Sequence, residues 1–123
     1  DNAIGEEIEF LDKHSFRETV DSRRSYVSKG IYENQIRLWF NVFPRKQIHI
    51  LSTEDMSNNP REELKEIFRF LDIDEYDIKQ PQKQKVTKYK QMKKETRKKL
   101  LNFYKPHNKR FFEIIQHEFE WNI

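Results

Sequence analysis

Apolar residues recur at helical spacing along much of the chain. Near the N-terminus, apolar residues at i, i+4 and i+7 predict a short amphipathic helix over residues 4–14. A second helical pattern covers residues 28–43, and Pro44 ends it because the residue before a proline avoids helical dihedral angles. We expect one face of this second helix to pack against the core, and that face carries Ile31, Gln35, Leu38, Trp39 and Val42.

A third helix is predicted after a clear start signal. Asn59 is a favourable N-cap, Pro60 suits the first helical position, and Glu62 stands at N3 as in a capping box. The residues that follow have the i, i+3, i+4, i+7 spacing of a helix with one buried face. That stripe consists of Leu64, Ile67, Phe68 and Leu71.

Two more helices are predicted near the C-terminus, and Pro106 separates them because proline disfavours a helix interior. The first begins near Thr96. Residues 72–92, which precede it, lack periodicity and predict a long loop, and loops of this length are often functional. The inward-facing residues are Leu100, Leu101 and Tyr104 in the first helix and Phe111, Ile114, Ile115 and Phe119 in the second.

One short run has the character of a strand. Residues 47–52 alternate and are rich in branched apolar side chains, which predicts a strand of four to six residues. A strand between helices is typical of an α/β unit with a parallel sheet. No other convincing strand is found, and a single strand cannot satisfy its own backbone groups. We therefore expect its partner strands to lie outside this chain or to come from another copy.

Two adjacent carboxylates, Glu54 and Asp55, follow this predicted strand. On extended backbone they would point to opposite faces, so they are poorly placed to act as a catalytic pair. We interpret them as residues at the strand end that contact nearby backbone amides or arginine side chains. The strand end is still a candidate position for a ligand, because α/β folds bind ligands at the C-terminal ends of strands.

Charge is distributed unevenly along the chain, although the net charge is only +3. Residues 79–110 hold thirteen Lys or Arg and a single acid, whereas residues 1–78 hold seventeen acids and eleven bases. Such a block indicates an anionic partner: a nucleotide, a sulfated or acidic substrate, nucleic acid or a membrane surface. A solvated lysine-rich helix face explains the same block equally well.

Composition excludes several classes of protein. The 10 Phe, 5 Tyr and 2 Trp argue against disorder, although 37% of the residues are charged. Without cysteine the chain has neither disulfides nor thiolate metal sites, and the four histidines lack metal-binding spacing, so no metal is expected. No secretory signal core or membrane span is found, and we expect a cytoplasmic protein without a membrane partner. No complete phosphate-binding glycine motif occurs.

The order of three stretches is more specific than any of these features. SKGIYENQIRLWFNVFP begins at Ser28, RKQIHILSTEDMSNNPREELKEIFRFLDI follows directly, and YKQMKKETRKKLLNFYKPHNKRFFEIIQHEFEW closes the chain. They resemble the G-x-Y helix, the strand with its E-D-[LM] turn and following helix, and the closing M-x-x-E-T and F-x-W pattern of sulfotransferases. The resemblance covers the chain from about Tyr26 onward and is closest to the bacterial and glycan-type members.

This resemblance implies a fold class. The chain is expected to be α/β: the C-terminal, mostly helical portion of a P-loop-like three-layer sulfotransferase fold, with one parallel strand at about residues 47–52. Residues 1–123 would form the C-terminal part of the domain, and the N-terminal nucleotide-binding half, with its phosphate loop, would be absent. The missing half would then hold the sheet partners of the strand.

The resemblance also implies a reaction. The parent protein would transfer a sulfuryl group from 3′-phosphoadenosine 5′-phosphosulfate to a hydroxyl or amine acceptor, and this chain alone would be inactive. The nucleotide contacts expected here are Ser28, Lys85, Lys88 and Tyr89, although the family's usual Lys-Gly-Arg signature is not present. No catalytic residue is expected in this chain. Gly30 is expected to permit close helix approach, and Tyr32 and Trp39 to pack.

Two alternatives without catalysis stay open. The basic segment could bind nucleic acid or another polyanion, since Tyr89, Phe103 and Tyr104 interleave with the cations as stacking platforms would. Phe103 and Tyr104 nonetheless fall at helical spacing with neighbouring leucines, which favours a place in the core, and nucleic acid is not the expected partner. The other alternative is a self-associating module, a homodimer that pairs through an exposed sheet edge.

Overall fold

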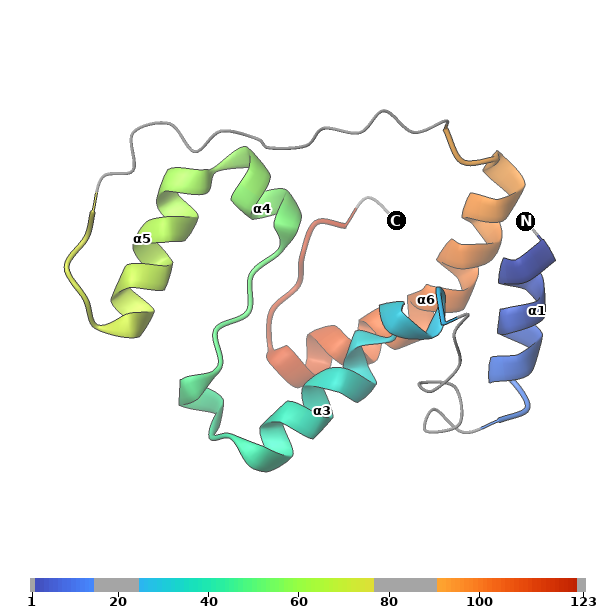
Figure 1. The fold of residues 1–123 in the computed structure, drawn as a ribbon, viewed down its shortest axis with the longest axis horizontal. Helices are drawn as coiled ribbons and strands as arrows, with labels where there is room; N and C mark the ends of the chain where they lie inside the picture. Colours follow the sequence, from blue (N-terminus) through green and yellow to red (C-terminus); the bar gives the residue numbers. More distant parts are fainter. Residues whose placement is uncertain (1, 15–24, 77–90, 122–123) are drawn as a thin grey trace. The chain divides into compact units, whose positions relative to one another are not determined.

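A computed structural model describes residues 2–14, 25–76 and 91–121. The elements in these ranges are all helical (Figure 1). The chain forms two compact units, Asp1–Val42 with Gln91–Ile123, and Phe43–Lys90. The first unit contains α1 (Asn2–Leu11), the 3₁₀ turn η1 (Ser28–Gly30), α3 (Tyr32–Val42) and α6 (Lys94–Ile115); the second contains η2 (Arg45–Gln47), α4 (Thr53–Asn58) and α5 (Pro60–Leu71).

The first unit is built around the pairing of α3 with α6 (Figure 1). Ile36 of α3 and both Phe111 and Ile115 of α6 are buried, together with Val27 and Ile31 beside η1. The chain after α6 returns over the helix, where Phe119 is also buried. The predicted inward positions Phe111 and Ile115 are therefore confirmed, whereas Phe119 is buried outside the helix, which ends at Ile115 and not beyond Phe119 as predicted.

The predicted packing face of α3 is only partly right. Leu38, Trp39 and Val42 are exposed, at 59%, 57% and 72%, whereas Ile36 and the charged Glu33 are buried. Glu33 and Ile36 lie on the other side of the helix from the predicted apolar stripe. The helix turns this side inward because Glu33 meets charged partners on α6, and those contacts outweigh the burial of a few apolar side chains.

Gly30 lies directly against Tyr104 of α6. A Cβ atom at position 30 would stand 2.6 Å from the Tyr104 hydroxyl oxygen and 2.7 Å from Cζ of its ring. Real Cβ atoms essentially never approach other atoms so closely, so only glycine leaves room for the ring here. The predicted close approach at Gly30 is confirmed, and its partner is an aromatic side chain.

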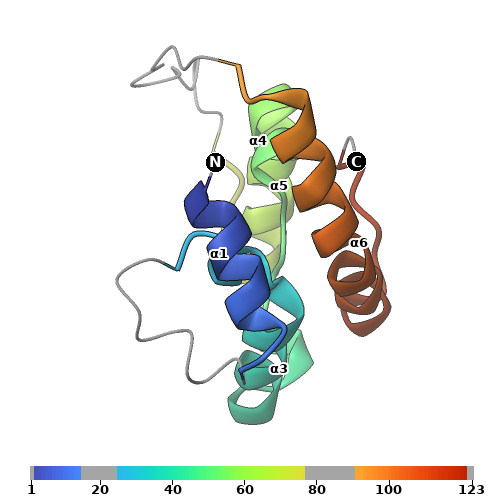
Figure 2. The same cartoon turned by 90° about the vertical axis from the view of Figure 1, so that its right-hand side faces the viewer.

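Pro106 does not separate two helices, contrary to the sequence prediction. A single helix, α6, runs through it from Lys94 to Ile115. Proline removes one backbone hydrogen bond and crowds the preceding turn, which bends a helix without ending it when the flanking turns are held by packing. In both Figure 1 and Figure 2 the orange and red parts of α6 run in different directions.

In the second unit, Glu54 and Asp55 lie in the first turn of α4. The N-cap of this helix is Ser52, whose Oγ accepts a hydrogen bond from the Asp55 backbone amide at 2.9 Å and donates to Asp55 Oδ2 at 2.6 Å. Two acidic groups at a helix N-terminus complement its partial positive charge. The two carboxylates are helix-start residues, as opposed to a catalytic pair.

The start of α5 follows the sequence prediction in part. Asn59 is its N-cap and Pro60 opens the first turn, but the Asn59 side chain makes no capping bond. Glu62 pairs with Lys65 instead of closing a capping box. The helix ends at Asp72, which adopts a left-handed conformation. Leu64, Ile67 and Phe68 of the predicted stripe are half-buried, and Leu71 is exposed.

No strand is present in the described parts of the chain, so the predicted strand over residues 47–52 is not confirmed. Gln47 belongs to η2, and Thr53 already begins α4. Ile48 does have extended dihedral angles, with φ −120° and ψ 114°. A strand requires a hydrogen-bonded neighbour, and the described residues offer this segment none.

None of the helices in the described ranges is both long and apolar enough to span a lipid bilayer.

The contact between Gly30 and Tyr104 generates a prediction. We expect Gly30→Ala to lower the free energy of unfolding by about 1–3 kcal/mol, because the added methyl group forces the Tyr104 ring out of its place. Gly5→Ala is the matched control: no atom lies within 4 Å of a Cβ there, and in α1 the change should be neutral or stabilising by up to about 1 kcal/mol. Urea unfolding of both variants measures the difference, and equal effects would contradict the contact.

Candidate functional site

Of the predicted nucleotide contacts, Ser28 lies within the described residues, and it is hydrogen-bonded to the carboxylate of Glu7. Oε1 of Glu7 accepts hydrogen bonds from the Val27 and Ser28 amides, each at 2.9 Å, and from Ser28 Oγ at 3.1 Å. Oε2 accepts from the Tyr26 amide, also at 2.9 Å. One side chain of α1 thereby satisfies three consecutive backbone donors, from Tyr26 to the first residue of η1.

These hydrogen bonds join α1 to η1 and use both the amide and the hydroxyl of Ser28. The serine is only 1% exposed, and its hydroxyl donates to Glu7. Its role as a nucleotide contact stays a prediction, while its role in holding the chain is visible. Lys85, Lys88 and Tyr89 lie outside the described residues.

Tyr104 of α6 continues the same set of contacts. Its hydroxyl donates to the Val27 carbonyl at 2.8 Å, next to the segment that Glu7 holds. Burial raises the pKa of Tyr104 to about 12, and the charge of Glu7 and the nearby Tyr32 act in the same direction. Tyr104 is therefore a neutral hydrogen-bond donor at physiological pH. Its half-buried ring serves packing, as the core interpretation predicted.

Glu33 of α3 forms an ion pair and hydrogen bonds with α6. Its Oε2 accepts from Arg110 Nε at 2.6 Å, and its Oε1 accepts from Arg110 Nη2 at 2.7 Å. This is the two-pronged geometry in which a guanidinium binds a carboxylate most favourably. His107 Nδ1 also lies 2.6 Å from Oε1. Two cationic or donor groups from one turn of α6 thus meet a single buried carboxylate.

Opposing effects set the ionisation of Glu33. Burial raises the pKa of its carboxyl, since the side chain is only 7% exposed, but hydrogen bonds and charges from Arg110 and His107 outweigh it and hold the pKa below the usual range. Glu33 in turn raises the pKa of Arg110. The pair is ionised at neutral pH, so the contact is an ionic one.

We call this set of contacts the polar junction; it comprises Glu7, Ser28, Glu33, Tyr104, His107 and Arg110. It joins α1, η1, α3 and α6 within the first unit. Sequence reasoning missed Glu7, Glu33, His107 and Arg110. A weak signal was present, since Tyr104, His107 and Arg110 recur every third residue along the inner face of α6. The carboxylate partner of His107 and Arg110 is Glu33, which lies 74 and 77 residues before them in the sequence. Periodicity does not reveal so distant a partner.

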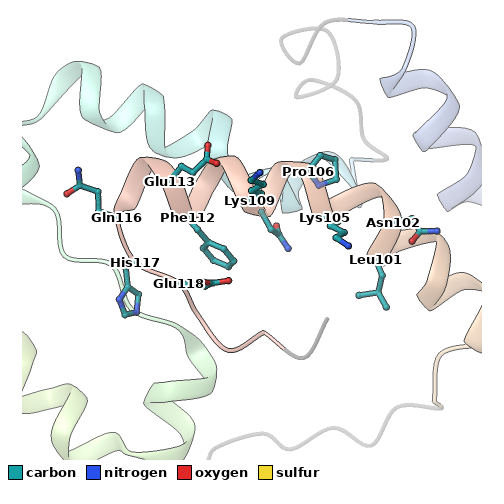
Figure 3. A pocket seen from close by; sticks show the side chains of 11 residues that line it. Leu101, Asn102, Lys105, Pro106, Lys109, Phe112, Glu113, Gln116, His117 and Glu118 are labelled. Atoms are coloured by element: carbon teal, nitrogen blue, oxygen red, sulfur yellow. The ribbon is translucent and has the colours of Figure 1, made fainter.

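A pocket opens on another face of α6, between the helix and the returning chain. It has a volume of about 1180 Å³ and combines apolar and charged side chains. In Figure 3, Leu101, Lys105 and Phe112 project from the side of α6 on which the segment after the helix lies, and that segment carries His117 and Glu118. The remaining lining residues are Asn102, Pro106, Asn108, Lys109, Glu113 and Gln116. The sequence prediction did not single out this pocket.

Among the described residues there is no group of three or more His, Asp or Glu side chains that could hold a metal ion.

The pKa of Glu33 generates a prediction about acid stability. Because the folded-state pKa is below the ordinary value of 4.5, the ionised carboxylate stabilises the fold above that pH, and the contribution is lost as pH falls through the lowered pKa. Glu33→Gln should lower the free energy of unfolding by about 1–3 kcal/mol at neutral pH. The difference from the wild type should narrow on acidification.

Glu62→Gln is the matched control for this prediction. Glu62 pairs with Lys65 on the surface of α5, where its side chain is 70% exposed, so its removal should cost less than about 1 kcal/mol. The unfolding temperatures of the two variants, measured at a series of acidic pH values, distinguish these expectations. A Glu33→Gln variant that loses stability on acidification as steeply as the wild type would contradict the assignment.

Comparison with known proteins places these features in a family. Residues 6–117 match the sulfotransferase domain. The chain is 33% identical over 95 residues to the membrane-associated sulfotransferase kil1 of Dictyostelium discoideum, an alignment that covers 77% of this chain and 20% of that protein. It is 32% identical over 92 residues to carbohydrate sulfotransferase 15 of Nototodarus sloanii, with 66% of this chain and 58% of the relative covered.

The chain thus spans about a fifth of one of these relatives and somewhat over half of the other. No solved structure is significantly similar to it. The family match includes both helices of the α3–α6 pair and every residue of the polar junction. The chain belongs to the sulfotransferase domain family.

Proposed function

We propose that the protein transfers a sulfuryl group from 3′-phosphoadenosine 5′-phosphosulfate to a hydroxyl or amine acceptor. The observation that carries the proposal is the match of residues 6–117 to the sulfotransferase domain. Sulfuryl transfer resembles in-line phosphoryl transfer, in which the protein positions two reactants and stabilises negative charge that spreads over the transferred group. The cation-rich stretch of residues 79–110 supports such a task.

In this proposal the chain is the C-terminal part of the sulfotransferase domain. It completes the core and covers the nucleotide, while a nucleotide-binding half outside these 123 residues supplies the phosphate loop and the acceptor-activating base. The limited share of the relatives' length that the chain covers supports this division. The absence of a complete phosphate-binding glycine motif from the sequence supports it as well.

The proposed nucleotide contacts are those that the sequence indicated. Lysine side chains at Lys85 and Lys88 would pair with phosphate or sulfate oxygens, and charge-assisted bonds of this kind are strong. Tyr89 would contribute a ring or a hydroxyl. Ser28 is the fourth proposed contact; in this structure its hydroxyl and its amide both donate to Glu7, so a nucleotide would have to replace that carboxylate.

The segment around Ile48 would form a strand in the complete domain. Its backbone is already extended at Ile48, and it is followed by the capped start of α4 at Ser52. A neighbouring strand from the nucleotide-binding half would satisfy the backbone groups that extended residues leave open. This would restore the α/β architecture with a parallel strand over residues 47–52.

The acceptor is proposed to be a glycan. One relative is named as a carbohydrate sulfotransferase, which supports membership among the glycan-type enzymes. A cytoplasmic location without a membrane partner, and pairing of two copies through the open edge at residues 47–52, are further proposals. The other relative is named as membrane-associated, so cell fractionation is the direct measurement of location.

The transfer reaction is tested by measuring sulfuryl transfer from a radiolabelled donor with a panel of glycan acceptors. We expect no turnover from the purified 123-residue chain and turnover from the protein that includes the upstream coding region. In that longer protein, replacement of both Lys85 and Lys88 by alanine should raise the KM for the donor about tenfold or more, because two charge-assisted contacts are lost.

Replacement of Lys13 and Lys46 by alanine removes the same charge at exposed positions and serves as the control. An unchanged donor KM in the Lys85 and Lys88 variant would exclude these residues as nucleotide contacts. An upstream region that encodes no strand followed by a phosphate loop, with no transfer by the longer protein, would refute the proposed function.

A further inference from the structure

A single carboxylate, that of Glu7, joins α1 to residues 26–28. Four described hydrogen bonds connect them, at 2.9 to 3.1 Å, and all four end on Glu7. The apolar packing of α1 is incomplete, because none of its described side chains is buried and Ile4, Ile8 and Leu11 are half-buried. The extensive helix contact of this unit lies between α3 and α6. The attachment of α1 therefore depends strongly on one acidic side chain.

Glu7 uses the same donors that an oxyanion would need. Its Oε1 accepts from both the amide and the hydroxyl of Ser28, which is only 1% exposed. Its Oε2 accepts from the Tyr26 amide. Phosphate and sulfate oxygens accept hydrogen bonds from the same kinds of N–H and O–H groups, so the carboxylate and such a ligand exclude each other at Ser28. A nucleotide can reach the donors of Ser28 once Glu7 has moved away.

The segment next to Ser28 has a second support that does not involve α1. The Tyr104 hydroxyl of α6 donates to the Val27 carbonyl at 2.8 Å, and the ring of Tyr104 lies directly against Gly30. Val27 itself is only 1% exposed. These contacts hold the segment on α6. We therefore expect that loss of the Glu7 contacts frees α1 and leaves residues 27–30 in place.

We propose that α1 is an autoinhibitory strap, with Glu7 as its latch, that closes the Ser28 position to the nucleotide donor. The proposal rests on the proposed function, in which Ser28 is a donor contact. In the closed state Glu7 accepts the hydrogen bonds of Ser28, as in this structure. In the open state α1 is detached, and a phosphate or sulfate oxygen of the donor takes the place of the carboxylate.

Such a strap lowers the affinity for the donor without contacting it. The apparent dissociation constant equals the intrinsic one divided by the fraction of the protein that is open. Hydrogen bonds to a carboxylate are among the stronger ones, and four of them favour the closed state. Donor binding then shifts the population toward the open state and detaches α1.

A purely structural role for Glu7 predicts the opposite change. If Glu7 only positioned residues 26–28 for the donor, its loss would loosen that segment and weaken donor binding. If Glu7 is a latch, its loss removes a competitor and strengthens donor binding. The direction of the change in donor affinity therefore distinguishes the two roles.

The experiment compares Glu7→Gln with Glu9→Gln in the full-length protein. Glutamine keeps the size of the side chain at position 7, but it has no charge and one acceptor oxygen where the carboxylate has two. Glu9 is an exposed residue of the same helix, so its replacement removes the same charge away from the latch. Binding of 3′-phosphoadenosine 5′-phosphosulfate without an acceptor is measured by isothermal titration calorimetry.

We expect the dissociation constant of the donor to fall about tenfold in Glu7→Gln, because the cost of opening is removed, and to stay unchanged in Glu9→Gln. Hydrogen exchange gives a second measurement. Saturation of the wild type with donor should reduce the protection of the α1 amides, and Glu7→Gln should show this low protection without donor. Unchanged protection of α3 and α6 in the variant verifies that it is folded.

Weaker or equal donor binding by Glu7→Gln, compared with the wild type, would overturn the strap. Equal gains in the two glutamate variants would overturn it as well, and so would α1 amides that keep their protection in the wild-type donor complex. Donor binding by the wild type together with any of these results contradicts the strap alone. Absence of donor binding in both the wild type and Glu7→Gln would refute the proposed function and the strap together.

Discussion

The buried carboxylate of Glu33 meets Arg110 and His107 of α6, and the arrangement of the first unit depends on this contact. A buried charge is unfavourable unless it is paired and hydrogen-bonded, so α3 must face α6 with this side and no other. The same constraint explains why Leu38 and Trp39 stay exposed although they are apolar. Once α6 is held in this register, Tyr104 meets the Val27 carbonyl and the bare backbone of Gly30.

The two sides of α6 have different roles, and the polar junction lies on one of them. Its inner side binds α3 and the segment before η1, through an aromatic hydroxyl, an imidazole and a guanidinium. Its outer side carries four exposed lysines that form no ion pair within the described residues: Lys94, Lys98, Lys105 and Lys109. A helix that is structural on one face and cationic on the other can present charge on a rigid support. That property suits a domain in a family whose reactions involve anionic groups.

Local signals in the sequence predicted several helix ends correctly. Pro44 and Pro60 were correctly placed at a helix end and a helix start, and Gly30 at a close approach. Pro106 was misjudged because packing on both sides of a helix can override the local penalty of proline. The strand at residues 47–52 was predicted from side-chain pattern alone, but a strand exists only through hydrogen bonds to a neighbour. The polar junction was missed for a similar reason: its partners are distant in sequence and carry no periodicity.

Hydrogen exchange of backbone amides tests most directly whether the α3–α6 pairing is the stable centre of the first unit. If it is, amides across both halves of α6, before and after Pro106, should share one high protection level with those of α3 and exchange through a common opening. Amides of α5, in the second unit, should open separately and more readily, since none of its residues is fully buried. Independent exchange of the two halves of α6, or stronger protection in α5 than in α3, would contradict this account.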